Sequence, residues 1–269
     1  VAAVRVTSAE LSALPTASAA TTRQRCSPAG APKLVVPPLV DGAEMACSCV
    51  TDSPDVVEVV TAMLGAAAPA PLLVEMSTIA PAVARDLAAR CAERGVAYLD
   101  CPVSGGPTGA AAGTLAFMCG GDADIYAKAE PLVMSFARMC KLLGPSGNGQ
   151  LAKMCNQIAI AGLVQGLAEC VQFGMKAGLN MEDVIEVISK GAAGSWQMEN
   201  RHKTMIAGKF DFGFAVDWMR KDLGICLEAA RNNGAHLPVT ALVDQFYSEV
   251  QKMGGKRWDT SSLIARLNR

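Results

Sequence analysis

The sequence predicts an α/β domain with a parallel sheet, followed by an all-α domain. Two observations predict this fold class. Between residues 46 and 100 short apolar strands alternate with segments of helical periodicity, and after the glycine-rich break at 144–149 no convincing strand follows. Strands and helices that alternate at this length form parallel sheets with both faces covered, and such sheets bind ligands at the carboxyl ends of their strands.

The first domain is built from repeated strand and helix units. Apolar runs bounded by polar turns are typical of buried strands, and apolar residues that recur every three or four positions are typical of helices. The polar turn 51–54 separates the first strand from the first helix, and Gly95 ends the second helix. The predicted order is strand 46–50, helix 56–64, strand 71–76, helix 82–95 and strand 96–100. Thr51, Thr78 and the segment after Asp100 therefore lie at carboxyl ends of strands.

The second domain starts with one long helix that is apolar nearly all round. It covers residues 150–178, and a helix of this kind is buried inside a helical domain or a subunit interface. Its most apolar run, Ile158–Ala168, is broken by Gln165 and followed by Glu169, so it falls short of the roughly 20 apolar residues that cross a bilayer. No transmembrane segment is predicted. Further helices are predicted at 181–190, 196–206, 214–232 and 239–253.

The composition argues against several classes of partner. The 269 residues are 51% hydrophobic, enough for a globular core, and 24 basic against 25 acidic residues leave a net charge of -1. Nucleic acid and membrane surfaces require a one-sided basic field, which this balance does not supply. The ten cysteines include no Cys-x-x-Cys pair, and His202 and His236 have no ligand at metal spacing. We expect most of the cysteines to be buried thiols in a reducing compartment, and we expect no metal site.

Residues 1–40 are atypical. They hold one acidic residue, Glu10, against four basic residues, in a background rich in Ala, Ser, Thr and Pro. Such a composition fits an organelle transit segment, a disordered arm or an altered remnant of a domain, and these alternatives stay open. The localisation stays open with them: it is cytoplasmic, or organellar if the segment is a transit peptide.

A glycine-rich turn follows the strand that ends at Asp100. Residues 100–106 read Asp-Cys-Pro-Val-Ser-Gly-Gly, and such glycines can turn successive backbone N–H groups toward one point, as anion-binding nests do. The turn therefore predicts a site for a carboxylate or a phosphate. A tight connection before the next element explains the same glycines without a ligand. No Gly-Lys-Ser/Thr sequence is present, which disfavours a kinase-like phosphate site.

A lysine occupies the start of the long apolar helix. Lys153 and Asn156 stand three positions apart on one helical face, after Gly147 and Gly149. A buried lysine can be poised between its charged and neutral forms and can pass a proton to or from a substrate oxygen. Lys153 is therefore the candidate proton-transfer group, although an unselected lysine more commonly extends to solvent from a helix start. Lys221, taken alone, indicates only a solvated helix face.

These motifs, in this order, resemble the β-hydroxyacid dehydrogenases, the family of 3-hydroxyisobutyrate dehydrogenase, tartronate semialdehyde reductase and glyoxylate/succinic semialdehyde reductase. The likeness runs over residues 41–269. Residues 100–106 are similar to the family's substrate-binding signature and residues 147–156 to its catalytic signature; 221–223 and 75–79 match two further blocks. The resemblance implies an incomplete Rossmann-like parallel-sheet domain over 41–145 and an all-helical substrate and dimerisation domain over 146–269.

The resemblance also implies the chemistry: a hydride moves between NAD or NADP and a short 3-hydroxy acid or its semialdehyde. Lys153 would transfer the hydroxyl proton, and Asn156 would orient the substrate. The other implied contacts are with the substrate carboxylate, at Ser104, Gly105 and Gly106, and with the cofactor, at Thr78 and Lys221 and more weakly at Val50, Thr51 and Asp55. Family members bury the long helix at a dimer interface, so a homo-oligomer is expected, with Gly162 and Gly166 as a flat strip on that helix.

The N-terminus departs from the family pattern. Members open with a strand, a Gly-x-Gly-x-x-Gly turn and a helix that seats the pyrophosphate, and nothing in residues 1–45 matches this unit. The residue that selects NAD or NADP, at the end of the second strand, is missing too. We therefore expect an oxidoreductase with impaired cofactor binding. The alternative is a non-catalytic dimeric scaffold that keeps the fold. The particular hydroxy acid and the direction of the reaction stay open.

Overall fold

The computed structural model describes residues 4–6 and 43–268. What residues 1–40 form therefore lies outside the described residues, apart from a strand at Val4–Val6. The chain divides into two compact units, Val1–Lys153 and Met154–Arg269. This division falls inside one continuous helix, α6 (Asn148–Lys176), eight residues after the boundary predicted between 145 and 146.

The first unit contains a four-stranded sheet in the order β1-β2-β3-β4. Its strands are β1 (Val4–Val6), β2 (Met45–Ser48), β3 (Leu72–Glu75) and β4 (Ala97–Asp100). The last three run parallel, as predicted, and α2 (Ser53–Leu64) and α3 (Pro81–Glu93) connect them. β1 instead runs antiparallel to β2, with Val6 opposite Met45. The carboxyl ends of β2, β3 and β4 therefore share one edge of the sheet, and the chain leaves β1 at the other edge.

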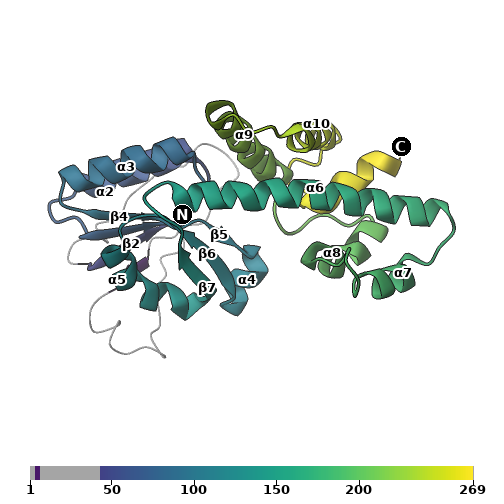
Figure 1. Cartoon of the computed structure of the whole chain (residues 1–269), viewed down its shortest axis with the longest axis horizontal. Coiled ribbons are helices and arrows are strands. Elements are labelled where there is room, and N and C mark those ends of the chain that lie inside the picture. Colours follow the sequence, from purple (N-terminus) through teal and green to yellow (C-terminus); the bar gives the residue numbers. More distant parts are fainter. Residues whose placement is uncertain (1–3, 7–42, 269) are drawn as a thin grey trace. The chain divides into compact units, whose positions relative to one another are not determined.

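Both faces of this sheet are buried, because side chains alternate between the faces along each strand. Leu73 and Tyr98 pack with residues of α2 and α3 on one face, the side on which Figure 1 shows both helices. Val74 and Leu99 point to the other face and pack with residues of α5 (Ala123–Val133) and of a second, smaller sheet. The prediction of a parallel sheet covered on both sides is confirmed.

The local sequence explains where the helices of this unit begin. α2 follows Asp52, whose carboxylate accepts a hydrogen bond of 2.6 Å from the backbone N–H of Ser53. Proline stands in the first turn of both helices, at Pro54 and Pro81, where its missing N–H costs nothing. The buried residues of α2 recur at helical spacing: Val56, Val59, Val60, Met63 and Leu64.

The smaller sheet has the order β5-β6-β7 and occupies a stretch for which no strand was predicted. It consists of β5 (Val103–Ser104), β6 (Leu115–Cys119) and β7 (Ala137–Leu142), with α4 (Gly106–Ala112) between the first two. β5 and β6 pair antiparallel, and β6 and β7 pair parallel. Burial alternates along β6, but all five of its residues are apolar, so the sequence hides this alternation.

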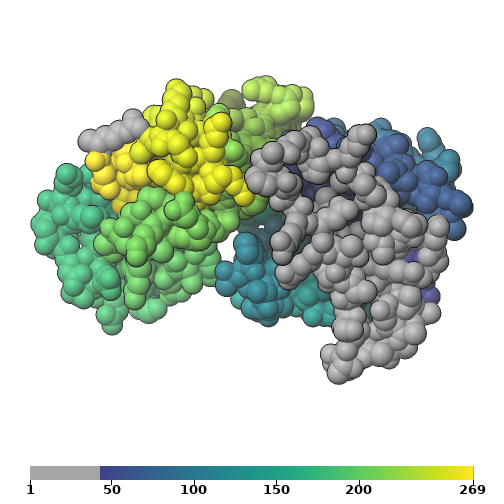
Figure 2. Space-filling model, turned by 180° about the vertical axis from the view of Figure 1, so that it is seen from behind, coloured from purple at the N-terminus to yellow at the C-terminus, as the bar shows by residue number. Residues whose placement is uncertain are grey.

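The second unit is helical among its described residues. All five predicted helices are present: α6, α7 (Met181–Ile188), α8 (Trp196–Ile206), α9 (Val216–Asn233) and α10 (Pro238–Lys252). A 3-10 segment, η2 (Thr260–Asn268), packs against α8 and α10, and Figure 2 shows this yellow segment next to green residues. One apolar core joins these elements through residues such as Val164, Leu223, Tyr247 and Ile264.

Among the described residues, α6 alone is long and apolar enough to cross a membrane by length and composition. Its most apolar window has a mean hydropathy of 1.4, and 39% of that window is buried. The core helix of a globular domain passes the same test, and Ala161, Val164, Leu167, Ala168 and Val171 of α6 belong to the core of the second unit. A membrane-spanning role is therefore only weakly indicated, and the absence of a transmembrane segment stays an expectation.

Candidate active site

The loops that follow β2 and β3 are tied together at the carboxyl edge of the large sheet. The backbone N–H of Val50 donates to the hydroxyl of Ser77 over 2.7 Å, and the backbone N–H of Ser77 donates to a carboxylate oxygen of Glu75 over 2.7 Å. Glu75 is fully buried, and burial raises the pKa of its carboxyl. This arrangement holds the predicted cofactor contacts Thr51 and Thr78 on adjacent loops of one edge.

A glutamine that the sequence analysis missed clamps the loop around Thr78. Gln150 is fully buried at the start of α6. Its side-chain oxygen accepts a hydrogen bond of 3.0 Å from the N–H of Ile79, and its side-chain nitrogen donates to the carbonyl oxygen of Ser77 over 2.9 Å. The two bonds flank Thr78 on both sides in the chain. The backbone at Thr78 therefore has a fixed position relative to the start of α6.

Asp100 fixes the same helix start from the end of β4. Its two carboxylate oxygens accept hydrogen bonds from the backbone N–H groups of Gly147, at 2.7 Å, and Gln150, at 3.0 Å. A negative charge at a helix N-terminus complements the unpaired N–H groups there. Asp100 is fully buried, and burial raises its pKa to about 6 against the opposing effect of these backbone hydrogen bonds.

The glycine pattern before Lys153 follows from this close contact. A Cβ atom at Gly149 would lie 2.4 Å from the carbonyl oxygens of both Asp100 and Met118. A Cβ atom at Gly120 would lie 2.7 Å from a carboxylate oxygen of Asp100. Only glycine lets the start of α6 approach β4 and β6 this closely.

Lys153 lies on α6, one turn after Gln150. Its exposed fraction is only 7%, so it is buried and does not extend to solvent from the helix start. Because α6 is fixed by Asp100 and Gln150, the backbone of Lys153 has a defined position relative to β4 and to the loop at Thr78. A buried amine held in this way suits a group that exchanges a proton with a bound substrate.

The predicted carboxylate site forms a tight turn at the surface of the first unit. Ser104 ends β5 and is half-buried, whereas Gly105 and Gly106 are exposed. The φ angles of these glycines are 129° and 59°, a region that disfavours other residues. A Cβ at Gly105 would also lie 3.1 Å from the side chain of Leu115. The conformation suits a backbone nest, and the role of these residues toward a carboxylate stays a prediction.

The remaining predicted residues fall into two groups. In the first unit, Val50 is half-buried, and Thr51 and Asp55 are exposed beside the start of α2. In the second unit, Asn156 on α6 and Lys221 on α9 are half-buried. The second unit also contains a buried pair that the sequence analysis missed, Gln157 and Asp222, which connects Asn156 to Lys221.

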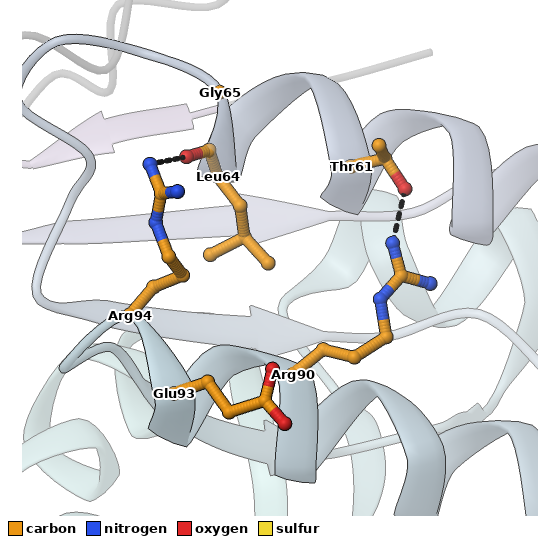
Figure 3. Close-up of a pocket in the computed structure, with 6 residues that line it drawn as sticks. All are labelled: Thr61, Leu64, Gly65, Arg90, Glu93 and Arg94. Carbon is orange, nitrogen blue, oxygen red and sulfur yellow. Dashed lines mark hydrogen bonds between the residues drawn. The ribbon is translucent and has the colours of Figure 1, made fainter.

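A shallow depression of about 320 Å³ lies elsewhere, between the C-terminal ends of α2 and α3 (Figure 3). Its two arginines have structural partners: Arg90 donates to the Thr61 hydroxyl over 2.5 Å, and Arg94 donates to the carbonyl oxygen of Leu64, at the end of α2, over 2.9 Å. These helix ends precede the next strands, so the depression lies at the amino edge of the sheet, away from Thr51 and Thr78.

Known families match both units. A model described as the NAD binding domain of 6-phosphogluconate dehydrogenase matches residues 4–144. A second, described as NAD-binding of NADP-dependent 3-hydroxyisobutyrate dehydrogenase, matches residues 147–267. The chain belongs to the β-hydroxyacid dehydrogenase family. The cofactor of this family is NAD or NADP, which confirms the predicted family and cofactor class.

Similar proteins agree with this assignment. The chain is 60% identical over 198 residues to an uncharacterized oxidoreductase of Shewanella frigidimarina, a match that covers 74% of this chain and 68% of the relative. It is 39% identical over 206 residues to the NAD-dependent L-serine dehydrogenase of Pseudomonas aeruginosa, covering 74% of this chain and 69% of that enzyme. The matches thus span about two thirds of these relatives' lengths.

Solved structures confirm the fold class of a Rossmann-like domain followed by an all-α domain. The 3-hydroxyisobutyrate dehydrogenase of Mycobacterium tuberculosis, in a structure described with L-serine, matches with a TM-score of 0.77 and 31% identity over 86% of this chain and 81% of that chain. The 3-hydroxyisobutyrate dehydrogenase of Salmonella typhimurium matches with a TM-score of 0.75 and 25% identity over 83% and 79%.

Proposed function

We propose that this dehydrogenase-family chain transfers a hydride between NAD or NADP and a short 3-hydroxy acid or its semialdehyde, with Lys153 as the proton-transfer group. The observation that carries the proposal is the burial of Lys153 on a helix whose start is anchored to β4 by Asp100 and to the loop at Thr78 by Gln150. Burial with fixed geometry is what a proton-transfer group needs, and a surface lysine would need neither.

The loop at Thr78, at the carboxyl edge of the sheet, suits a contact with the nicotinamide side of a dinucleotide, because its backbone is clamped. Lys221, which is half-buried on α9 of the second unit, would be a further cofactor contact. When bound, the nicotinamide would supply or accept the hydride. Lys153 would take the proton from the substrate hydroxyl during oxidation and return it to the carbonyl oxygen during reduction. Ser104, Gly105 and Gly106 would hold the carboxylate, and Asn156 would orient the hydroxyl.

The N-terminal part of the chain fits the pyrophosphate of the cofactor less well. A dinucleotide-binding unit needs a first strand parallel to the second, so that the glycine turn and helix N-terminus lie at the carboxyl edge. β1 runs antiparallel to β2, and residues 1–45 contain no Gly-x-Gly-x-x-Gly sequence. This observation favours the second candidate, a non-catalytic dimeric scaffold. We place it second because a scaffold gives no reason for a buried Lys153.

The proposal is tested by an assay of nicotinamide absorbance with a panel of short acids, among them 3-hydroxyisobutyrate and L-serine, with NAD and NADP at millimolar concentration. We expect turnover with acids that carry a hydroxyl on the β-carbon, and none with their methyl esters. Ser104→Ala should raise the KM for the acid by the equivalent of about 1.5–3 kcal/mol, the value of one hydrogen bond to a charged group. An unchanged KM would place the carboxylate elsewhere.

A further inference from the structure

Two helices of the second unit each contribute one residue to a polar pair inside an apolar core. Gln157 on α6 is 3% exposed and Asp222 on α9 is 1% exposed, and the side-chain nitrogen of Gln157 donates to a carboxylate oxygen of Asp222 over 2.5 Å. The neighbours of Asp222 on α9, Met219 and Leu223, are fully buried and belong to the apolar core. Burying a carboxylate there costs free energy unless its oxygens have partners.

The chemistry of this pair sets the direction of two amides. A carboxylate only accepts hydrogen bonds, so Gln157 must turn its NH2 group toward Asp222 and its oxygen away. That oxygen accepts a hydrogen bond of 2.7 Å from the side-chain nitrogen of Asn156. The nitrogen of Asn156 therefore faces Gln157, and its oxygen is turned away from Gln157. One carboxylate thus orients both amides in series.

The other oxygen of the same carboxylate holds Lys221. The two atoms, the Lys221 Nζ and the Asp222 Oδ1, lie 2.9 Å apart, and the side chain of Lys221 is only 18% exposed. A lysine side chain is long and flexible, so an ion pair with a buried carboxylate restrains where its charge lies. Asp222 therefore restrains Lys221 directly and Asn156 through Gln157. The proposed function assigns Lys221 to the cofactor and Asn156 to the substrate.

We propose that Asp222 and Gln157 are positioning residues: Asp222 sets the place of the Lys221 charge, and Gln157 passes the orientation of that carboxylate to the amide of Asn156. The inference rests on the proposed function for the roles of Lys221 and Asn156. It predicts separable effects, because Asp222 acts on both residues, whereas Gln157 acts on Asn156. A pair that served only to join α6 to α9 would lower stability without this separation.

The first test does not depend on activity. The full chain is labelled with acetic anhydride under limiting conditions, and the labelling rate of each lysine is measured by peptide mass spectrometry. We expect Asp222→Asn to speed the labelling of Lys221 about tenfold, because the ion pair that restrains Lys221 is lost. The labelling of Lys190, an exposed lysine that pairs with Glu199 instead, should stay unchanged. Asp217→Asn, on the same helix and bonded to Gln251 at 2.5 Å, is the matched control and should leave Lys221 unchanged. An unchanged Lys221 rate in folded Asp222→Asn overturns the proposal.

The second test separates KM from kcat. Gln157→Leu should lower kcat about tenfold with little change in the cofactor KM, whereas Asp222→Asn should also raise the cofactor KM about tenfold. Gln165→Leu, a buried glutamine on the same helix that bonds Glu169, should change neither. If both site variants lose thermal stability but keep kcat and KM, the pair is merely structural and the proposal fails. Absence of turnover in the parent chain would overturn the proposed function alone. The labelling rates would still show whether Asp222 restrains Lys221.

Discussion

The carboxylate of Asp100, at the end of β4, accepts a hydrogen bond of 3.0 Å from the backbone N–H of Gln150, in the first turn of α6. This bond connects the end of a sheet strand to the helix that carries Lys153. Gln150 then uses its side chain to hold the loop at Thr78. The end of β4, the loop at Thr78 and the start of the lysine-bearing helix thus form one buried hydrogen-bonded cluster.

The titration of Asp100 should make the stability of the chain depend on pH. Burial raises its pKa from 3.8 to about 6, so the folded state binds this proton more tightly than the unfolded chain. The stability contribution of Asp100 is therefore fully present below about pH 4 and is lost as the pH rises through about 6, a change of about 3 kcal/mol at 1.36 kcal/mol per pKa unit. Asp100→Asn lacks this titration.

Urea unfolding of the parent and of Asp100→Asn across this pH range measures the effect. The parent should gain stability relative to the variant as the pH falls from about 7 to about 4. The comparison isolates Asp100, because the other carboxyls titrate in both proteins. A stability difference that stays constant across the range would show that the pKa of Asp100 is not raised.

Gly149→Ala should damage the fold at the start of α6. The new Cβ would lie 2.4 Å from two backbone oxygens that cannot move without shifting β4 or β6. Overpacking of this kind costs about 1–3 kcal/mol or more. Gly224→Ala is the control, since its Cβ meets nothing within 4 Å on the exposed side of α9, and it should stabilise the chain by about 0.5–1 kcal/mol. Equal changes in Tm for the two variants would contradict the close contact of Gly149 with β4 and β6.

The chain should form a homo-oligomer through an exposed apolar part of α6. Leu163 is 38% exposed and Phe173 is 72% exposed, and a Cβ at Gly166 would meet nothing within 4 Å. Sedimentation equilibrium at micromolar concentration should show a mass above that of one chain. Phe173→Glu should shift it toward the monomer, whereas Val187→Glu, at a residue of α7 that is 73% exposed, should not. A monomer at all concentrations would refute this surface as an interface.

Dinucleotide binding should be weak. A glycine turn normally gives the pyrophosphate two or three charge-assisted hydrogen bonds of about 1.5–3 kcal/mol each, so their loss implies on the order of 10³-fold weaker binding or worse. We expect saturation only at high concentration when nicotinamide fluorescence follows a titration with NADH or NADPH. Low-micromolar affinity would mean that residues 1–40 supply a phosphate site of their own.

The sequence predicted much of the large sheet and of the helical unit because their signals are local. The apolar periodicity located β2, β3, β4 and all five helices of the second unit, and the glycine pattern located Lys153. It missed the smaller sheet of β5, β6 and β7. β5 has only two residues, and the five residues of β6 are all apolar, so no alternation of apolar and polar residues indicates that strand.

The polar residues that organise the site could not be predicted in the same way. Gln150 bonds Ile79, which is 71 positions away, and Gln157 bonds Asp222, which is 65 positions away. No local sequence pattern predicts a hydrogen bond between residues so far apart. The one available signal is a polar residue at a position that the apolar periodicity assigns to the core. This signal indicates that the residue needs a partner, but not which residue the partner is.

Turnover at millimolar NAD or NADP with a short 3-hydroxy acid tests whether Lys153 transfers the proton. Lys153→Ala should lose about 10²–10⁴ in kcat with the fold retained, because a general acid or base contributes that much. Lys153→Arg should fail equally, since a guanidinium does not release its proton. We expect measurable turnover in the parent and its loss in both variants. Turnover in Lys153→Ala within a few-fold of the parent would contradict this role of Lys153.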